Sequence, residues 1–366
     1  MSSPRRSSRP SLMKSTRDAR RKVESRHRRD LRLDEQNNHY RHNYSPFIIA
    51  TSFYNVIHIH RFTTNDTIST LINHFDSCYR YSIDTELDRF TYDLSLMQVH
   101  SIPQHLPSFV VLFEINQFPS SDSLLMSKIT SLFSLLFRSG NTIFSWGSMF
   151  KELKPAVQMN LFQWPTSARF IDLQRHFGVW YRRALPPCEA CGSIQPSNVV
   201  QSLQSRCSCM NNSPYVKSTD KWSLQNAIRY TVNRFLDKSS TMKNWSVMLD
   251  PRHSSLSSSE QHRRIKYAVY DCFAVTVLHR AIYEKWSLIE LREAELTSLF
   301  TSKAVHSSSL LESTLLEDVT DDENEPTATR LPTSTAPTCS SSKHLPIFLE
   351  DISDGTSDED GEIMLS

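Results

Sequence analysis

Charged residues of opposite sign are concentrated at the two ends of the chain, which leaves only the middle able to form a folded core. Residues 1–32 contain twelve Lys or Arg and three acidic residues, whereas the C-terminal end carries acidic runs such as 358–360. A segment that has many charges of the same sign and few apolar residues cannot bury enough apolar surface to offset the conformational entropy lost on folding. We therefore predict a basic, disordered arm at 1–44, an ordered domain at 45–290 and an acidic, disordered tail at 304–366.

The composition argues against several classes of protein. Six glycines in 366 residues are too few to suggest the glycine-rich loops of P-loop and dinucleotide-binding proteins. The sequence has no run of about twenty apolar residues, and no apolar leader segment follows the N-terminal arginines, so we expect neither membrane association nor secretion. We expect an intracellular protein, nuclear rather than cytoplasmic. The basic arm is open to two interpretations: it binds nucleic acid or directs nuclear import, or it is only a solvated run of charge.

Between the charged ends, the spacing of apolar residues alternates between strand and helix patterns. Segments with strand-like alternation are interspersed with segments of helical periodicity. The strands 81–86, 93–99 and 108–115 follow one another closely, which predicts an antiparallel meander. The predicted strands are 47–49, 54–60, 81–86, 93–99, 108–115, 141–146 and 170–174, and the predicted helices are 67–76, 121–138, 222–236 and 261–284. This pattern predicts an α/β domain with a mixed sheet flanked by helices.

Two carboxylates stand one residue apart at the end of the predicted strand 81–86. Side chains alternate faces along a strand, so Asp84 and Glu86 project to the same side. Two anionic groups held together repel each other unless a cation lies between them, and oxygen ligands favour Mg²⁺ or Mn²⁺. The alternative is a solvated turn after a short strand. The sequence around the two residues does not distinguish a metal site from a turn.

A tyrosine and an aspartate share one face of the predicted helix 261–284. Tyr267 and Asp271 are four residues apart, which places them one turn apart on the same side. A phenol and a carboxylate can therefore project together toward the sheet. The alternative is a half-buried core tyrosine and an unrelated surface charge.

The ordered set of motifs resembles the 3′–5′ exonuclease domain of the DEDD group, in the ribonuclease H-like superfamily. The motifs are Asp84-Thr85-Glu86 on a first strand, a hairpin after it, the strand that begins at Asn141, the helix opened by Trp222-Ser223, and Tyr267-x-x-x-Asp271. The tyrosine places the resemblance in the branch of ribonuclease D and the Werner-syndrome exonuclease. It covers 47–284, with one insertion.

The resemblance implies a reaction and roles for individual residues. Asp84, Glu86 and Asp271 would bind two Mg²⁺ or Mn²⁺ ions, with Asp84 shared between them, and Tyr267 would orient the attacking water. The chain would hydrolyse phosphodiester bonds at the 3′ end of DNA or RNA and release nucleoside 5′-monophosphates.

One position departs from the family pattern. The second motif of the family places an aspartate after the strand at 141–146, but here the corresponding positions are Ser145 or Ser148. Glu152, one helical turn further, is the nearest carboxylate that could replace it. Two functions are therefore open: a metal-dependent exonuclease, or a catalytically weak or inactive protein that uses the same fold as a nucleic-acid-binding adaptor.

Two further features lie outside the exonuclease motifs. Cys188, Cys191, Cys207 and Cys209 form a cysteine-rich insertion at 186–214, and four thiolates predict one structural Zn²⁺ site. Free surface thiols are the alternative. In the acidic tail, the short apolar run at 345–349 is typical of a segment that adds as an edge strand to a partner protein.

Overall fold

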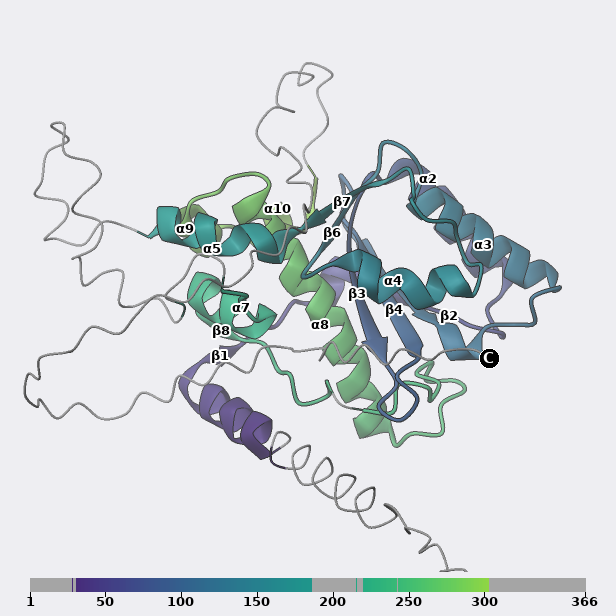
Figure 1. Ribbon diagram of the computed structural model, residues 1–366, viewed down its shortest axis with the longest axis horizontal. Helices are drawn as coiled ribbons and strands as arrows, with labels where there is room; N and C mark the ends of the chain where they lie inside the picture. Colours follow the sequence, from purple (N-terminus) through teal and green to yellow (C-terminus); the bar gives the residue numbers. More distant parts are fainter. Residues whose placement is uncertain (1–27, 29–30, 186–214, 216–219, 242, 303–366) are drawn as a thin grey trace, which may run out of the picture. The chain divides into compact units, whose positions relative to one another are not determined.

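Six strands form the mixed sheet at the centre of the fold (Figure 1). The computed structural model describes residues 28, 31–185, 215, 220–241 and 243–302. Strands β5, β4 and β3 run antiparallel, which confirms the predicted meander, whereas β2, β6 and β7 are parallel to their neighbours. The order across the sheet is β2 (Tyr54–Ile59), β5 (Ser108–Glu114), β4 (Leu94–Ser101), β3 (Arg80–Leu87), β6 (Thr142–Ser145) and β7 (Arg169–Asp172).

Helices cover both faces of this sheet, as the alternating pattern predicted. Neighbouring residues of one strand enter different cores: Leu96 packs with the α5, α7 and α8 side, and Met97 with the α2, α3 and α4 side. The first layer contains α5 (Leu173–Ala184), α7 (Leu224–Val232) and α8 (Ser258–Ile282), followed by α9 (Leu288–Glu293) and α10 (Leu296–Phe300). The second layer contains α2 (Asn65–Ser77), α3 (Leu124–Leu136) and α4 (Met149–Gln158). Two short 3-10 turns, η1 (Thr51–Phe53) and η2 (Ile115–Gln117), adjoin the strands.

Helix α8 carries two of the predicted site residues, Tyr267 and Asp271, and buried polar contacts fix its position on the sheet. Ser257 caps its N-terminus by accepting from the Glu260 amide. In the interior, Ser82 on β3 donates to the Cys272 carbonyl (2.9 Å) and lies 2.7 Å from the Thr276 hydroxyl. His100 on β4 contacts the same hydroxyl through Nδ1 at 2.7 Å. Because buried polar groups must find partners, a shift of α8 along β3 would break several bonds at once.

The end of the basic arm is ordered, although we predicted disorder for 1–44. Residues 31–43 form a helix, and Tyr40 on it is buried. The Arg229 guanidinium lies 4.3 Å from the centre of the Tyr40 ring, and Arg41 pairs with Asp237 at 3.0 Å. The next residues form β1 (Ser45–Pro46), which pairs in parallel with β8 (Arg234–Phe235). Cation–π and ion-pair contacts with residues that are distant in sequence therefore stabilise this segment despite its high charge.

Among the described residues, no helix combines the length and the apolar character that crossing a bilayer would require.

The polar contacts of α8 can be tested with Thr276→Val, which keeps the volume of the side chain and removes its hydroxyl. Burial lowers the pKa of His100 to about 3, so its imidazole is neutral and loses its Nδ1 partner in the variant. We expect a loss of about 1–3 kcal/mol in the free energy of unfolding, measured by urea denaturation. The matched control is Thr70→Val on the exposed side of α2, where we expect a change within about 0.5 kcal/mol. Equal losses in the two variants would contradict this account.

Candidate metal and active site

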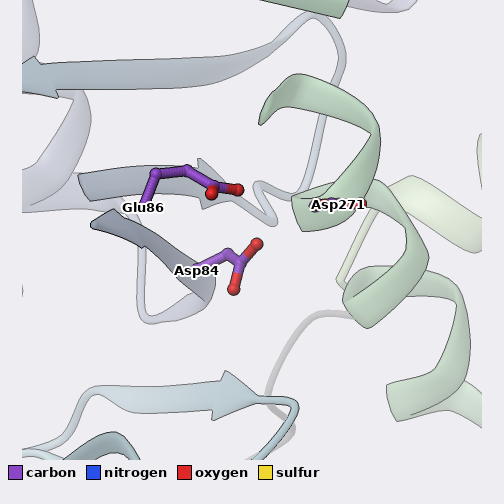
Figure 2. Close-up of side chains that lie close together, drawn as sticks. All are labelled: Asp84, Glu86 and Asp271. Carbon is purple, nitrogen blue, oxygen red and sulfur yellow. The ribbon is translucent and has the colours of Figure 1, made fainter. Parts of the chain in front are cut away.

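Three carboxylates from two elements converge on the α8 side of β3. Asp84 and Glu86 stand on the same face of β3, and Figure 2 shows both side chains extending toward the helix that carries Asp271. One oxygen of each lies within 4.8 Å of the corresponding oxygens of the other two. Glu86 and Asp271 are buried and Asp84 is partly exposed. The strand period and the helix packing together place these oxygens where one cation could contact all three.

The electrostatics of this cluster favour the uptake of a cation. Burial raises the pKa of Asp84 well above its usual range, and the neighbouring charge of Asp271 raises it further. Burial also raises the pKa of Glu86, with additional contributions from Asp84 and Asp271. The carboxylates therefore resist ionisation in each other's presence. A divalent ion would relieve this repulsion, and an all-oxygen donor set suits Mg²⁺ or Mn²⁺.

Tyr267 stands one turn before Asp271 on α8, as its sequence spacing predicted. Its hydroxyl lies 2.9 Å from the Thr241 hydroxyl, and the Lys238 ammonium donates to it at 3.4 Å. Burial, followed by the charges of Asp271 and Glu86, raises the Tyr267 pKa well above its usual value. The phenol therefore stays protonated beside the carboxylates and can donate a hydrogen bond.

Lys238 is a site residue that the sequence pattern did not indicate. Its Nζ donates to Asp271 Oδ2 at 2.8 Å, and the Lys238 side chain is 20% exposed whereas that of Asp271 is 0% exposed. It follows β8, which pairs with β1, in a connecting segment that carries no motif. The Lys238 charge opposes the upward shifts in the pKa values of Asp84 and Glu86.

Neither serine at the second-motif positions supplies the carboxylate that the family pattern places there. Ser145 donates to the Gly147 carbonyl at 2.9 Å, and Ser148 is the exposed N-cap residue of α4. Glu152, in the first turn of α4, accepts from the Thr85 hydroxyl at 3.0 Å and raises the pKa values of Asp84 and Glu86. Its charge therefore acts on the cluster, but Glu152 does not belong to the group of carboxylates that lie within 4.8 Å.

Asp172 holds the turn that leads into α4. It accepts from the Gln174 amide as the N-cap of α5, and from the Gly147 amide, both at 3.0 Å. Gly147 has a φ of 118°, a conformation that favours glycine. Asp172 thus has a structural role that accounts for its burial without a part in the metal site.

Two predicted features lie outside the described residues. They are the cysteine-rich insertion, with Cys188, Cys191, Cys207 and Cys209, and the apolar run in the acidic tail. The zinc site and the partner-binding tail stay predictions. Of the remaining cysteines, Cys78 in the second core and Cys272 on α8 are buried free thiols.

Comparison with known proteins gives likenesses at the level of structure. No protein-family model matches the sequence, and no curated protein sequence does. The Nibbler EXO domain of Aedes aegypti is 15% identical, with a TM-score of 0.39 over 70% of this chain and 99% of that domain. Escherichia coli RNase D, described as an exoribonuclease involved in structured RNA processing, is 16% identical, with a TM-score of 0.36 over 66% of this chain and 45% of that enzyme. The EXD2 exonuclease domain, soaked in Mn and Mg, is 16% identical, with a TM-score of 0.28 over 62% of this chain and 88% of that domain.

The three solved structures named here are an EXO domain, an exoribonuclease and an exonuclease domain. The chain spans less than half the length of the bacterial RNase D. The evidence for a function comes from the arrangement of the site's own residues.

Removing one carboxylate tests whether the cluster is repulsive without metal. Asp84→Asn keeps the shape of the side chain and removes one of the three charges, so we expect the metal-free variant to unfold about 2–4 °C above the wild type, which corresponds to about 1 kcal/mol for a domain of this size. With millimolar Mn²⁺ the order should reverse, because only the wild type retains the full ligand set. Differential scanning calorimetry with and without Mn²⁺ measures both differences.

The control for this experiment is Asp172→Asn, which alters a carboxylate outside the cluster. Because Asn caps a helix about as well as Asp, its melting temperature should stay close to that of the wild type without Mn²⁺ and should rise as much as that of the wild type when Mn²⁺ is added. A metal-dependent shift that is the same in Asp84→Asn as in the wild type would contradict a metal site at Asp84.

Proposed function

We propose that the chain is a metal-dependent 3′–5′ exonuclease that hydrolyses phosphodiester bonds at nucleic-acid 3′ ends. The observation that carries this proposal is the convergence of Asp84, Glu86 and Asp271 beside the protonated phenol of Tyr267. Three clustered carboxylates suit divalent ions, and a phenol within the same site suits the positioning of a water molecule. The products would be nucleoside 5′-monophosphates.

The residues of the cluster fit Mg²⁺ or Mn²⁺, because all three candidate ligands are carboxylates that lie close together. When bound, divalent metal would stabilise the negative charge that develops on the phosphate oxygens during the displacement. Asp84 has an oxygen within 4.8 Å of those of Glu86 and Asp271, so these three residues would hold the metal together. Tyr267 would orient the water molecule by donating or accepting a hydrogen bond at its hydroxyl.

A cavity of about 400 Å³ beside Tyr267 supports the binding of a nucleic-acid strand. Its wall combines aromatic rings, on which bases can stack, with basic side chains that can contact phosphates. The aromatic residues include Tyr44, Phe47 and Tyr270, and the basic residues include Arg41, Arg263 and Lys266. Since Tyr267 borders both the cavity and the carboxylates, a strand in the cavity would bring its end to the cluster.

A second candidate function is a nucleic-acid-binding adaptor without useful catalysis. Two observations favour it: no carboxylate occupies the second-motif positions Ser145 and Ser148, and Lys238 already neutralises part of the charge of Asp271. Such a protein would keep the cavity and its basic wall and would bind oligonucleotides without cleaving them.

A cleavage assay separates the two functions. A single-stranded oligonucleotide labelled at its 5′ end should shorten from the 3′ end in the presence of Mg²⁺ or Mn²⁺, with release of mononucleotides. Asp84→Ala should lower the rate by more than about 100-fold, because the loss of a residue that only supports a ligand already lowers activity or metal affinity by 10–100-fold. Binding without cleavage at every metal concentration would support the adaptor. Equal rates for Asp84→Ala and the wild type would refute the proposed site.

The role of the cavity can be tested by reversing one of its charges. Lys266 is exposed and its ammonium lies 5.3 Å from the centre of the Tyr270 ring. Lys266→Glu should raise the Kd for a single-stranded oligonucleotide about fivefold or more and reduce the salt dependence of binding, because one phosphate contact is lost. Fluorescence anisotropy over a range of salt concentrations measures both quantities. Lys128→Glu on α3, a helix of the opposite layer, is the matched control and should leave the Kd nearly unchanged.

A further inference from the structure

We propose that the Lys238 ammonium takes the place of one of the two divalent ions, so that the carboxylate site of this chain holds a single Mg²⁺ or Mn²⁺. The proposal rests on the metal site of the proposed function, but it does not depend on nuclease activity. It assigns Lys238 as a positioning residue for Asp271 and as a fixed cation of the site.

The contacts of Lys238 place its charge inside the cluster. Its Nζ donates to Asp271 Oδ2 at 2.8 Å and to the Tyr267 hydroxyl at 3.4 Å, and it lies 5.2 Å from the centre of the Tyr267 ring. Asp271 itself has oxygens within 4.8 Å of those of Asp84 and Glu86. The ammonium therefore lies where a cation bound to Asp271 would be expected.

The backbone around Lys238 is held from several sides, so its position follows from the fold. Thr241 donates from its hydroxyl to the Lys238 carbonyl at 2.9 Å, and the Ser239 amide donates to Asp237 at 2.8 Å. Asp237 is also paired with Arg41 of the helix at 31–43, and β8, just before it, pairs with β1. Lys238 thus lies in an ordered segment that is held by contacts both before and after it in the sequence.

The charge balance supports one ion. Within the group of close contacts, three ionised carboxylates and one ammonium carry a net charge of minus two, which one divalent ion neutralises; Glu152, whose charge acts on the cluster, lies outside this group. A second divalent ion would leave an excess of positive charge at a largely buried site, and such a charge is expensive without partners. The carboxylate that could offset it is absent from the second-motif positions, where Ser145 and Ser148 stand.

Glu152 does not restore that balance. Its carboxylate accepts from the hydroxyl of Thr85, which points to the opposite face of β3 from Asp84 and Glu86. Two features of this site act in the same direction: Ser145 and Ser148 supply no carboxylate, and the Lys238 ammonium adds a positive charge, so both reduce the number of divalent ions that the cluster can neutralise.

The test is the number of Mn²⁺ ions that the full, metal-free chain binds, measured by isothermal titration calorimetry and by electron paramagnetic resonance of free Mn²⁺. Asp84→Asn serves as the blank, so that binding elsewhere in the chain is subtracted. We expect the wild type to bind one Mn²⁺ at the cluster. Lys238→Met, which keeps the length of the side chain and removes its charge, should bind a second Mn²⁺ or bind the first at least tenfold more tightly.

Two further variants make the result specific. Lys238→Arg keeps a cation and should stay at one Mn²⁺ with an affinity close to that of the wild type, whereas Lys128→Met on α3 of the opposite layer should bind Mn²⁺ with the wild-type number and affinity. Two Mn²⁺ per wild-type chain at the cluster would overturn the proposal, as would a Lys238→Met variant with unchanged number and affinity. The wild-type number decides the question even if Lys238→Met does not fold.

The experiment also separates this proposal from the proposed function. If Asp84→Asn binds as much Mn²⁺ as the wild type, the metal site itself is refuted. If the wild type binds two ions that Asp84→Asn loses, the metal site stands and only the role of Lys238 is refuted.

Discussion

The contact between α8 and the central strands is the constraint on which the site depends. Ser82, His100 and Thr276 form a buried polar cluster that sets the position of α8 along β3. Asp271 stands five residues before Thr276 on α8, and Asp84 stands two residues after Ser82 on β3. A displacement of α8 by one turn would move Asp271 by about 5 Å, which exceeds the 4.8 Å within which the three carboxylate oxygens now lie. The stability of the core and the geometry of the metal site are therefore two effects of the same hydrogen bonds.

The parts of the site that sequence could predict are those set by short-range periodicity. Alternation along one strand put Asp84 and Glu86 on the same side, and the helical repeat put Tyr267 and Asp271 on one face; the structure brings both pairs together. The antiparallel meander followed from three closely spaced strands. In each case the relevant distance is determined within one element or between neighbouring elements.

The parts that could not be predicted depend on pairings between distant segments. Lys238, which pairs with Asp271, follows β8, and β8 pairs with β1, which is almost two hundred residues away in sequence. The helix at 31–43 looked too charged to fold, but Tyr40 finds its partner in Arg229 on α7. Similarly, α4 continues through Pro155, a residue that usually ends or kinks a helix, and Leu153 and Ala156 on either side of the proline are both fully buried in the second core. Tertiary contacts outweigh local preference at these three places.

The pairing of Arg41 with Asp237 links the N-terminal arm to the chemistry of the site. The helix at 31–43 precedes the first strand of the predicted domain, so a protein trimmed to the apparent domain boundary at Ser45 would lack it. Such a fragment would retain all three carboxylates and the tyrosine, but the segment that presents Lys238 would lose one of its anchors. The functional unit of this chain therefore begins before its central sheet, and part of the arm belongs to it as a support for the cation of the site.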